Sequence, residues 1–589
     1  MNKENLTAYG VVTEENLTDI HSTGWLLRHK KTGARVMLIE NDDENKVFNI
    51  AFRTPPKDST GVAHILEHSV LCGSREFPLK DPFVELVKGS LNTFLNAMTY
   101  PDKTCYPVAS CNDKDFQNLM HVYLDAVFYP NIYKREEIFR QEGWNYHLEQ
   151  KEGPLKYNGV VYNEMKGAFS SPDEVLEREI MNHLFPDTTY GCESGGDPKN
   201  IPDLTYENFL NFHRTYYHPS NSYIYLYGNM DMEKKLAFID EHYLSHFDYL
   251  DVDSVIQEQK AFGACQDVTL EYPVAENEGE EDNTYLSYNM VVGNAADSQM
   301  AMAFEVLDYA LLSAPGAPLK QALLDVKAGK DVYGSYDDGI LQPYFTVIAK
   351  GSNPDRKEEF VSVIRQVLGD IVKNGIDRKA VEAGINYFEF RYREADFSSY
   401  PKGLMYSLDI LGDWLYEKGN PFAQVQQLTV FEKLKKAVNE GYFEELIRKY
   451  LLENPHGCIM TLIPKKGLAA QREKELEEKL EAYRSSLSEE QLDAMVEKTK
   501  ALEAYQEAGE DPKALECIPM LKRSDIKKEA AKIVNEELTV DNSLFLYHDV
   551  CTNGIGYVDL MFKTDSIAPE QIPYLGLLKS VLGYVDTEH

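Results

Sequence analysis

The pattern of apolar and polar positions divides the chain into segments of different character. Over residues 1–265, short apolar runs such as KVFNIAFRT (46–54) alternate with stretches in which apolar residues recur every three or four positions. Short runs of this kind predict buried β-strands, and the longer spacing predicts amphipathic helices. One helix is expected at about 60–71, where Ser59 or Thr60 could cap its first turn. Residues 1–265 are therefore predicted to form one mixed domain.

A second unit with the same alternation is expected over residues 266–466. It opens with the strand QDVTLEYPV and closes with the strand CIMTLIPK. The pattern then changes, because residues 467–530 are rich in Glu, Lys, Ala and Leu at helical spacing. Within them, Ser488 and Gln491 fit a capping box between two helices. This segment is predicted to be a helical hairpin that links two larger parts.

A weak internal repeat connects these units. FNIAFRT (48–54) precedes the first predicted helix, and VDLMFKT (558–564) is almost the same motif ahead of KSVL (579–582). A fainter copy is AFEVLDYALLSAP (303–315). We therefore predict an α+β protein with two homologous α/β domains, a helical hairpin, and the start of a third domain over 531–589. Because a strand and one helix cannot bury a core alone, the chain is expected to be the front portion of a longer protein.

Composition and charge narrow the possible partners. Hydrophobic residues make up 43% of the chain and charged residues 26%, which is typical of globular proteins. The formal net charge of −36 argues against nucleic acid or an anionic membrane as a partner. The eight cysteines include no C-x-x-C pair, the N-terminus lacks a signal-like apolar stretch, and no apolar run is long enough to span a membrane. A cytoplasmic protein with free thiols is expected.

The candidate chemistry lies in HILEH, which contains His64, Glu67 and His68. Residues four apart share one face of a helix, so both imidazoles could bind a single metal ion. Two neutral imidazoles with a carboxylate suit Zn²⁺, which activates water, and Glu67 could take the proton of that water. The alternative is a polar helix face that carries two histidines without a metal.

A third ligand must come from elsewhere in the chain. Among many glutamates, Glu164 in NGVVYNEMKGAF is the best candidate, because an apolar run opens there into a helix. It could equally be a first-turn glutamate that stabilises the start of an ordinary helix. The residues alone leave these two interpretations open.

Several motifs together resemble one family. HILEH, the gap of 96 residues from His68 to Glu164, GVVYNEMKGAFSSPDE and ESGGDPKNIPDLTYENFLNFHRTYYHPSN are similar to the presequence peptidase branch of the inverzincins, the pitrilysin and insulysin-like zinc peptidases. The resemblance implies His64, His68 and Glu164 as ligands of one Zn²⁺ and Glu67 as the catalytic base.

The resemblance also implies a substrate site on residues 89–110, as the sheet edge on which an extended peptide lies. Asn96 and Ala97 match the residues that contact the peptide backbone. Pro101 and Pro107 argue modestly against an inner strand in this segment, because proline cannot donate a ladder hydrogen bond.

The expected function is zinc-dependent endopeptidase cleavage of short unstructured peptides. In the family, two halves joined by a helical hairpin enclose the peptide, and the second half supplies an Arg/Tyr pair that faces the zinc. Nearly all of that half is missing here. The alternative is therefore a catalytically incompetent fragment that binds zinc and peptide but needs the C-terminal half in trans.

Overall fold

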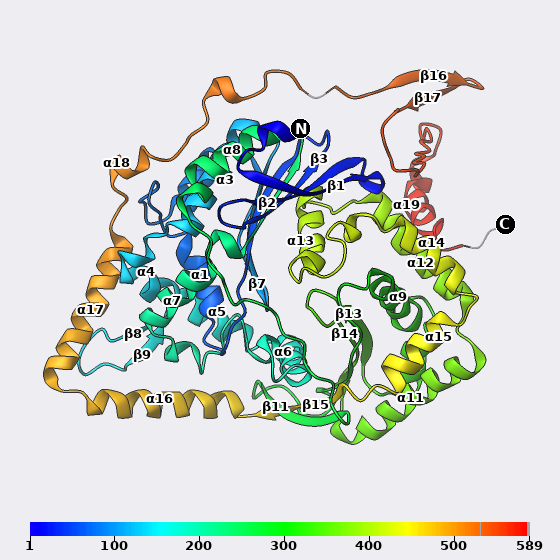
Figure 1. The fold of residues 1–589 in the computed structure, drawn as a ribbon. Helices are drawn as coiled ribbons and strands as arrows, with labels where there is room; N and C mark the ends of the chain where they lie inside the picture. Colours follow the sequence, from blue (N-terminus) through cyan, green and yellow to red (C-terminus); the bar gives the residue numbers. More distant parts are fainter. Residues whose placement is uncertain (531, 586–589) are drawn as a thin grey trace. The chain divides into compact units, whose positions relative to one another are not determined.

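The computed structural model describes residues 1–530 and 532–585 and confirms the expected α+β class (Figure 1). The chain divides into two compact units, Met1–Ile533 and Val534–His589. The first unit contains two large β-sheets, and the second contains one small hairpin. The helices of the first unit with the most bearing on the site are α1 (Val62–Val70), α2 (Pro82–Gly89), α3 (Asp113–Phe128), α4 (Glu136–Glu142), α5 (Val160–Ala168), α6 (Pro172–Leu184), α7 (Tyr206–Tyr216) and α8 (Met232–His242).

The first sheet is built from the N-terminal residues in the order β1-β2-β3-β10-β4-β7-β5, with β6 also paired to β7. Only β3 and β10 run parallel, and the other pairs are antiparallel. The strands are β1 (Tyr9–Leu17), β2 (Ser22–His29), β3 (Arg35–Glu40), β4 (Lys46–Arg53), β5 (Asn92–Leu95), β6 (Met98–Thr99), β7 (Lys103–Ser110) and β10 (Ser222–Gly228).

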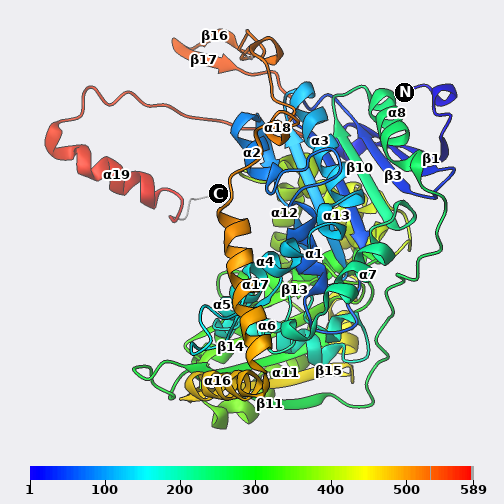
Figure 2. The same cartoon turned by 90° about the vertical axis from the view of Figure 1, so that its left-hand side faces the viewer.

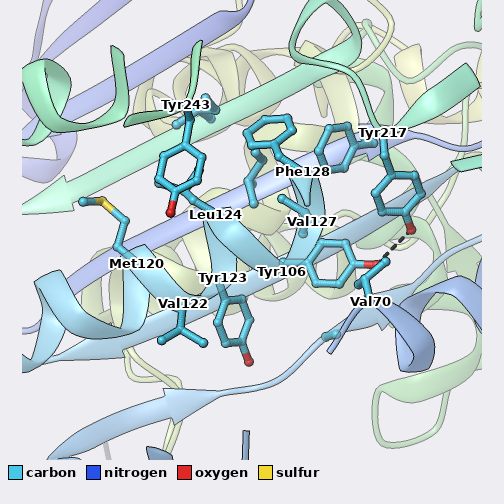
Figure 3. Packing of buried hydrophobic residues seen from close by; sticks show 14 of the residues in the cluster. Val70, Tyr106, Met120, Val122, Tyr123, Leu124, Val127, Phe128, Tyr217 and Tyr243 are labelled. Atoms are coloured by element: carbon cyan, nitrogen blue, oxygen red, sulfur yellow. Dashed lines mark hydrogen bonds between the residues drawn. The ribbon is translucent and has the colours of Figure 1, made fainter. Parts of the chain in front are cut away.

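Both faces of this sheet are covered, which is why its central strands are continuous apolar runs rather than alternating ones. All eight residues of β4 are buried. Phe48, Ile50 and Phe52 on one face join the cluster around α3, part of which Figure 3 shows at close range. Val47 and Ala51 on the other face pack in a cluster with residues of α13 (Lys402–Trp414).

The second sheet repeats the topology of the first. Its order, β11-β15-β12-β14-β13, matches β3-β10-β4-β7-β5, and the first pair is again parallel while the others are antiparallel. The strands are β11 (Gln266–Val274), β12 (Thr284–Val291), β13 (Asp331–Asp337), β14 (Tyr344–Ser352) and β15 (Gly457–Lys466). The repeat in the sequence therefore corresponds to a repeat of strand order and direction.

One face of the second sheet packs on helices of its own segment, and the other packs on α6 of the preceding segment. Each sheet is thus covered on one face by a helix from the other segment, because α13 covers the first sheet in the same way. The segment's other helices are α9 (Ser298–Asp308), α10 (Pro318–Asp325), α11 (Lys357–Asn374), α12 (Arg378–Glu394), α14 (Leu428–Ala437) and α15 (Tyr442–Leu446).

Residues 468–507 form two helices, α16 (Leu468–Ser486) and α17 (Glu489–Glu507). The expected capping box is present, because Gln491 N donates to Ser488 Oγ at 3.3 Å and Ser488 N donates to Gln491 Oε1 at 2.8 Å. A short helix, α18 (Pro512–Leu515), follows. Ala514 and Ile518 join the core of the first sheet, so the end of this segment packs on the N-terminal part of the chain.

The second unit contains β16 (Glu536–Val540), β17 (Ser543–Tyr547) and α19 (Ile572–Val581). The strand expected at 558–564 is absent, although the helix expected after it is present. Val558, Leu560, Met561 and Phe562 are 75–88% exposed, and no strand in the described part of the chain pairs with this segment. An extended run needs a neighbouring strand to satisfy its backbone groups. Nowhere among the described residues is there a helix both long and apolar enough to cross a membrane.

Candidate metal and catalytic site

Helix α1 carries HILEH and starts at a glycine. Gly61 has a left-handed φ of 68° and no side chain caps the helix, so the expected capping by Ser59 or Thr60 is wrong. A Cβ at Gly61 would lie 2.7 Å from Gly195 O, closer than side-chain carbons approach a backbone oxygen. Only glycine both adopts this backbone conformation without strain and lets the loop at Gly195 pack against the start of α1.

The three proposed ligands lie together although they come from two helices. His64 and His68 lie on α1 and Glu164 lies on α5. Glu164 Oε2 lies 3.8 Å from His64 Nε2 and 3.8 Å from His68 Nε2. Within the described residues, these are the side chains whose donor atoms gather closely enough to hold a metal, all within 4.8 Å of one another. Figures 1 and 2 both show α1, α4 and α5 close together.

The other nitrogen of each imidazole is held by an acceptor. His64 Nδ1 lies 3.0 Å from Gly195 O, and His68 Nδ1 lies 3.3 Å from Glu142 Oε2. Since a backbone carbonyl only accepts, His64 carries its hydrogen on Nδ1, and the same tautomer suits the carboxylate beside His68. Both Nε2 atoms are then lone-pair donors that face Glu164, as metal-bound histidines require.

Glu142 is a functional residue that the sequence analysis missed. Its side chain is buried, and its second oxygen accepts from Gln141 Nε2 at 2.7 Å. Burial alone would raise the pKa of Glu142, but the hydrogen bonds from His68 and Gln141 hold that pKa below its ordinary value. Burial would likewise lower the pKa of His68, but the hydrogen bond to Glu142 and the nearby carboxylates raise it. The site is therefore an anionic environment that favours a cation.

Glu67 lies on α1 beside His68 and is partly exposed. It is three residues after His64 and therefore on a neighbouring part of the helix surface. This places a carboxylate at the rim of the three-ligand cluster without making it one of the three converging groups. Such a group is free to exchange protons with a molecule bound at the cluster.

Asn96 and Ala97 lie between β5 and β6 at the edge of the first sheet, and β6 contacts α1. The expectation that the whole of 89–110 forms the edge is only partly right. Residues 92–99 form it, whereas β7, with the buried Pro107, is an inner strand between β4 and this edge. Pro107 is therefore not a signal of an edge strand.

The two other histidines of the family motif do not reach the metal cluster. His213 is 3% exposed, with Nε2 donating to Val127 O at 3.0 Å and Nδ1 lying 2.7 Å from Tyr133 Oη. His218 caps the short helical turn Pro219–Asn221 through its side chain. Both therefore have packing and capping roles rather than a place among the metal ligands.

The donor set fits zinc. Two imidazole nitrogens and one carboxylate oxygen are the ligands that catalytic Zn²⁺ sites use, with a fourth position left for water. Glu164 is 52% exposed, whereas His64 is 13% exposed, so the cluster opens to solvent on the side of α5. The tautomers set by Gly195 and Glu142 agree with this donor set.

Comparisons with known proteins give three family matches along the chain. Insulinase (Peptidase family M16) matches residues 52–190, the inactive domain of Peptidase M16 matches 203–388, and the domain associated with the C branch of Peptidase M16 matches 462–589. Among curated relatives, Protein HypA of Clostridium perfringens is 51% identical over the whole chain, which covers 60% of that protein. Presequence protease 1, chloroplastic/mitochondrial, of Arabidopsis thaliana is 41% identical over 96% of the chain, which covers 53% of that protein.

Solved structures share the fold at low sequence identity. A protease from Helicobacter pylori has a TM-score of 0.57 at 17% identity and covers 77% of this chain and 99% of its own. Pitrilysin has a TM-score of 0.56 at 15% identity over 78% of this chain and 47% of its own. The chain thus spans between half and two thirds of the length of the curated relatives described above. The chain belongs to peptidase family M16 and resembles its presequence-protease members.

Proposed function

We propose that this chain carries the metal ligands and catalytic base of a zinc-dependent endopeptidase that degrades short unstructured peptides. The observation that carries the proposal is the convergence of His64, His68 and Glu164, with both Nε2 atoms free to bind and both Nδ1 atoms held by acceptors. Family membership supports the same chemistry.

The chain's own residues supply the remaining steps. Zinc, when bound, lowers the pKa of water towards about 7 and polarises a carbonyl oxygen. Glu67 takes a proton from the attacking water and passes it to the amine that leaves. The edge at 92–99 binds the peptide as an added strand, so main-chain hydrogen bonds give affinity with little demand on sequence. A folded protein has no free extended segment to offer such an edge.

A second candidate is a fragment that binds zinc and peptide but cleaves only when the remaining half of the protein is added. Two observations favour it. The chain covers 53–60% of the two relatives described above, and the second unit exposes apolar residues such as Phe562 and Met561, which are 82% and 88% exposed. Apolar surface of this kind marks an interaction site.

Peptide cleavage by the purified chain of known zinc content tests the proposal. We expect cleavage of a fluorogenic unstructured peptide that is lost on zinc removal and falls at least a hundredfold in Glu67→Gln, because a general base contributes roughly 10²–10⁴-fold. Glu358→Gln, on the exposed start of α11, is the matched control and should cleave like the unaltered chain. One equivalent of bound zinc without cleavage would favour the fragment, to which the missing half is then added in trans. Absence of zinc binding would refute both candidates.

A further inference from the structure

The peptide-binding edge has a missing hydrogen bond in its own ladder. Phe94, Leu95, Met98 and Thr99 pair with β7 in one continuous antiparallel register, which places Asn96 opposite Pro107. Asn96 N donates to Pro107 O at 3.4 Å. In an antiparallel ladder such a pair exchanges two hydrogen bonds. Proline has no N–H, so β7 offers no donor to the carbonyl of Asn96.

A tyrosine of α3 supplies that donor. Tyr123 Oη lies 3.2 Å from Asn96 O, and since a carbonyl only accepts, the hydroxyl donates. Tyr123 is 1% exposed, so its position is set by the core rather than by solvent. Figure 3 shows its hydroxyl pointing away from the hydrogen-bonded pair Tyr106 and Tyr217, whose hydroxyls lie 2.8 Å apart.

We infer that Tyr123 is a positioning residue for peptide binding, whose hydroxyl replaces the N–H that Pro107 lacks and holds the edge strand in place at Asn96. The inference rests on the proposed function, because it concerns the edge on which the peptide would lie. Tyr123 lies on α3, beneath the strand, and acts through the backbone of Asn96.

The consequence is a division of labour between Asn96 and Ala97. Both backbone groups of Asn96 are used within the protein, by Pro107 O and by Tyr123 Oη. Backbone groups alternate in direction along a strand, so the N–H and C=O of Ala97 face away from β7. Ala97 therefore offers the main-chain hydrogen bonds to a peptide, and Asn96 offers only its side chain. This refines the expectation that both residues contact the peptide backbone.

Loss of the hydroxyl would act on binding and not on the chemical step. Without Tyr123 Oη, the carbonyl of Asn96 must turn towards solvent or stay unpaired, and either outcome loosens the strand beside Ala97. The ligands and Glu67 lie on α1 and α5 and keep their contacts. A neutral hydrogen bond contributes enough to change affinity roughly three- to tenfold.

Four variants test the inference: Tyr123→Phe, Pro107→Ala, the double variant, and Tyr217→Phe as the control. Pro107→Ala restores a backbone N–H opposite Asn96, so Tyr123→Phe should matter much less in that background. Tyr217→Phe removes a buried hydroxyl from the same core without touching the edge. All are made in the zinc-loaded full chain with Glu67→Gln, so that a labelled unstructured peptide is bound but not cut.

Two readouts separate this inference from the proposed function. Deuterium exchange of residues 91–100 without peptide should be faster in Tyr123→Phe, and should return towards the starting rate in the double variant and be unchanged in Tyr217→Phe. The peptide Kd from fluorescence anisotropy should rise three- to tenfold in Tyr123→Phe only. Unaltered exchange and Kd in Tyr123→Phe would overturn the inference. Changed exchange with no peptide bound by any variant would instead overturn the proposed function while supporting the hydrogen-bond substitution.

Discussion

Replacing Glu142 by Gln would test how far a residue distant in sequence orients the metal site. The substitution keeps the shape of the side chain and removes the charge that faces His68 Nδ1 at 3.3 Å. The amide oxygen of Gln can still accept from Nδ1, but as a neutral acceptor it makes a weaker hydrogen bond. The amide can also turn its NH₂ group towards His68, which would favour the tautomer that cannot bind metal through Nε2.

The magnitude follows from the role of the contact. Substitution of a group that orients a metal-bound histidine typically costs 10–100-fold in metal affinity. Because Gln retains one acceptor, we expect about a tenfold rise in the zinc Kd for Glu142→Gln, about 1.4 kcal/mol. Glu142→Ala leaves no acceptor within a buried site and should approach a hundredfold. His64 keeps its bond to Gly195 O in both variants, so binding is weakened but not abolished.

Competition between the chain and a chelator of known zinc affinity measures this directly. Glu136→Gln is the matched control, because Glu136 is an exposed carboxylate on the same helix. Denaturant unfolding of the metal-free chain shows whether a variant is folded before its zinc Kd is compared. A zinc Kd for Glu142→Gln equal to that of Glu136→Gln, in folded protein, would refute the argument that this carboxylate orients His68.

Two further predictions concern the stability of the site's surroundings. Burial lowers the pKa of His213 to about 4, so the folded state binds fewer protons than the unfolded state below the ordinary histidine pKa of about 6.5. Stability from the neutral imidazole is complete above that pH and is lost as the pH falls towards 4. Between pH 7 and 4.5, denaturant unfolding should show a loss about 2–3 kcal/mol greater in the unaltered chain than in His213→Gln, and equal losses would contradict the neutral buried state. Gly61→Ala places a Cβ 2.7 Å from Gly195 O at a positive φ, and should lower the free energy of unfolding by more than about 1 kcal/mol and weaken zinc binding through His64. Gly263→Ala, where a Cβ would meet no atom within 4 Å, is its control, and similar behaviour of the two variants would refute the packing argument.

Local periodicity accounts for what could be predicted from the sequence. Apolar runs predicted the strands β4 and β12, because a strand buried on both faces is apolar at every position. Helical spacing put His64 and His68 on one face of α1, and a spacing of three residues identified the capping box at Ser488 and Gln491. These features depend on residues within one or two turns, so a reader of the sequence sees both partners together.

Tertiary packing alone decided the rest of the site. Glu142 is 74 residues from His68 and Gly195 is 131 residues from His64, and nothing local to either residue marks it as a partner of a histidine. The exchange of α6 and α13 between the two sheets is likewise invisible in a repeat that reports only similar strands. Tyr123 reads as one more apolar position on α3, and Pro107 as a mark of an edge strand. Only the fold brings the hydroxyl of one to the carbonyl that the other leaves without a donor, because hydrogen bonds between distant segments are set by how helices pack on the sheet.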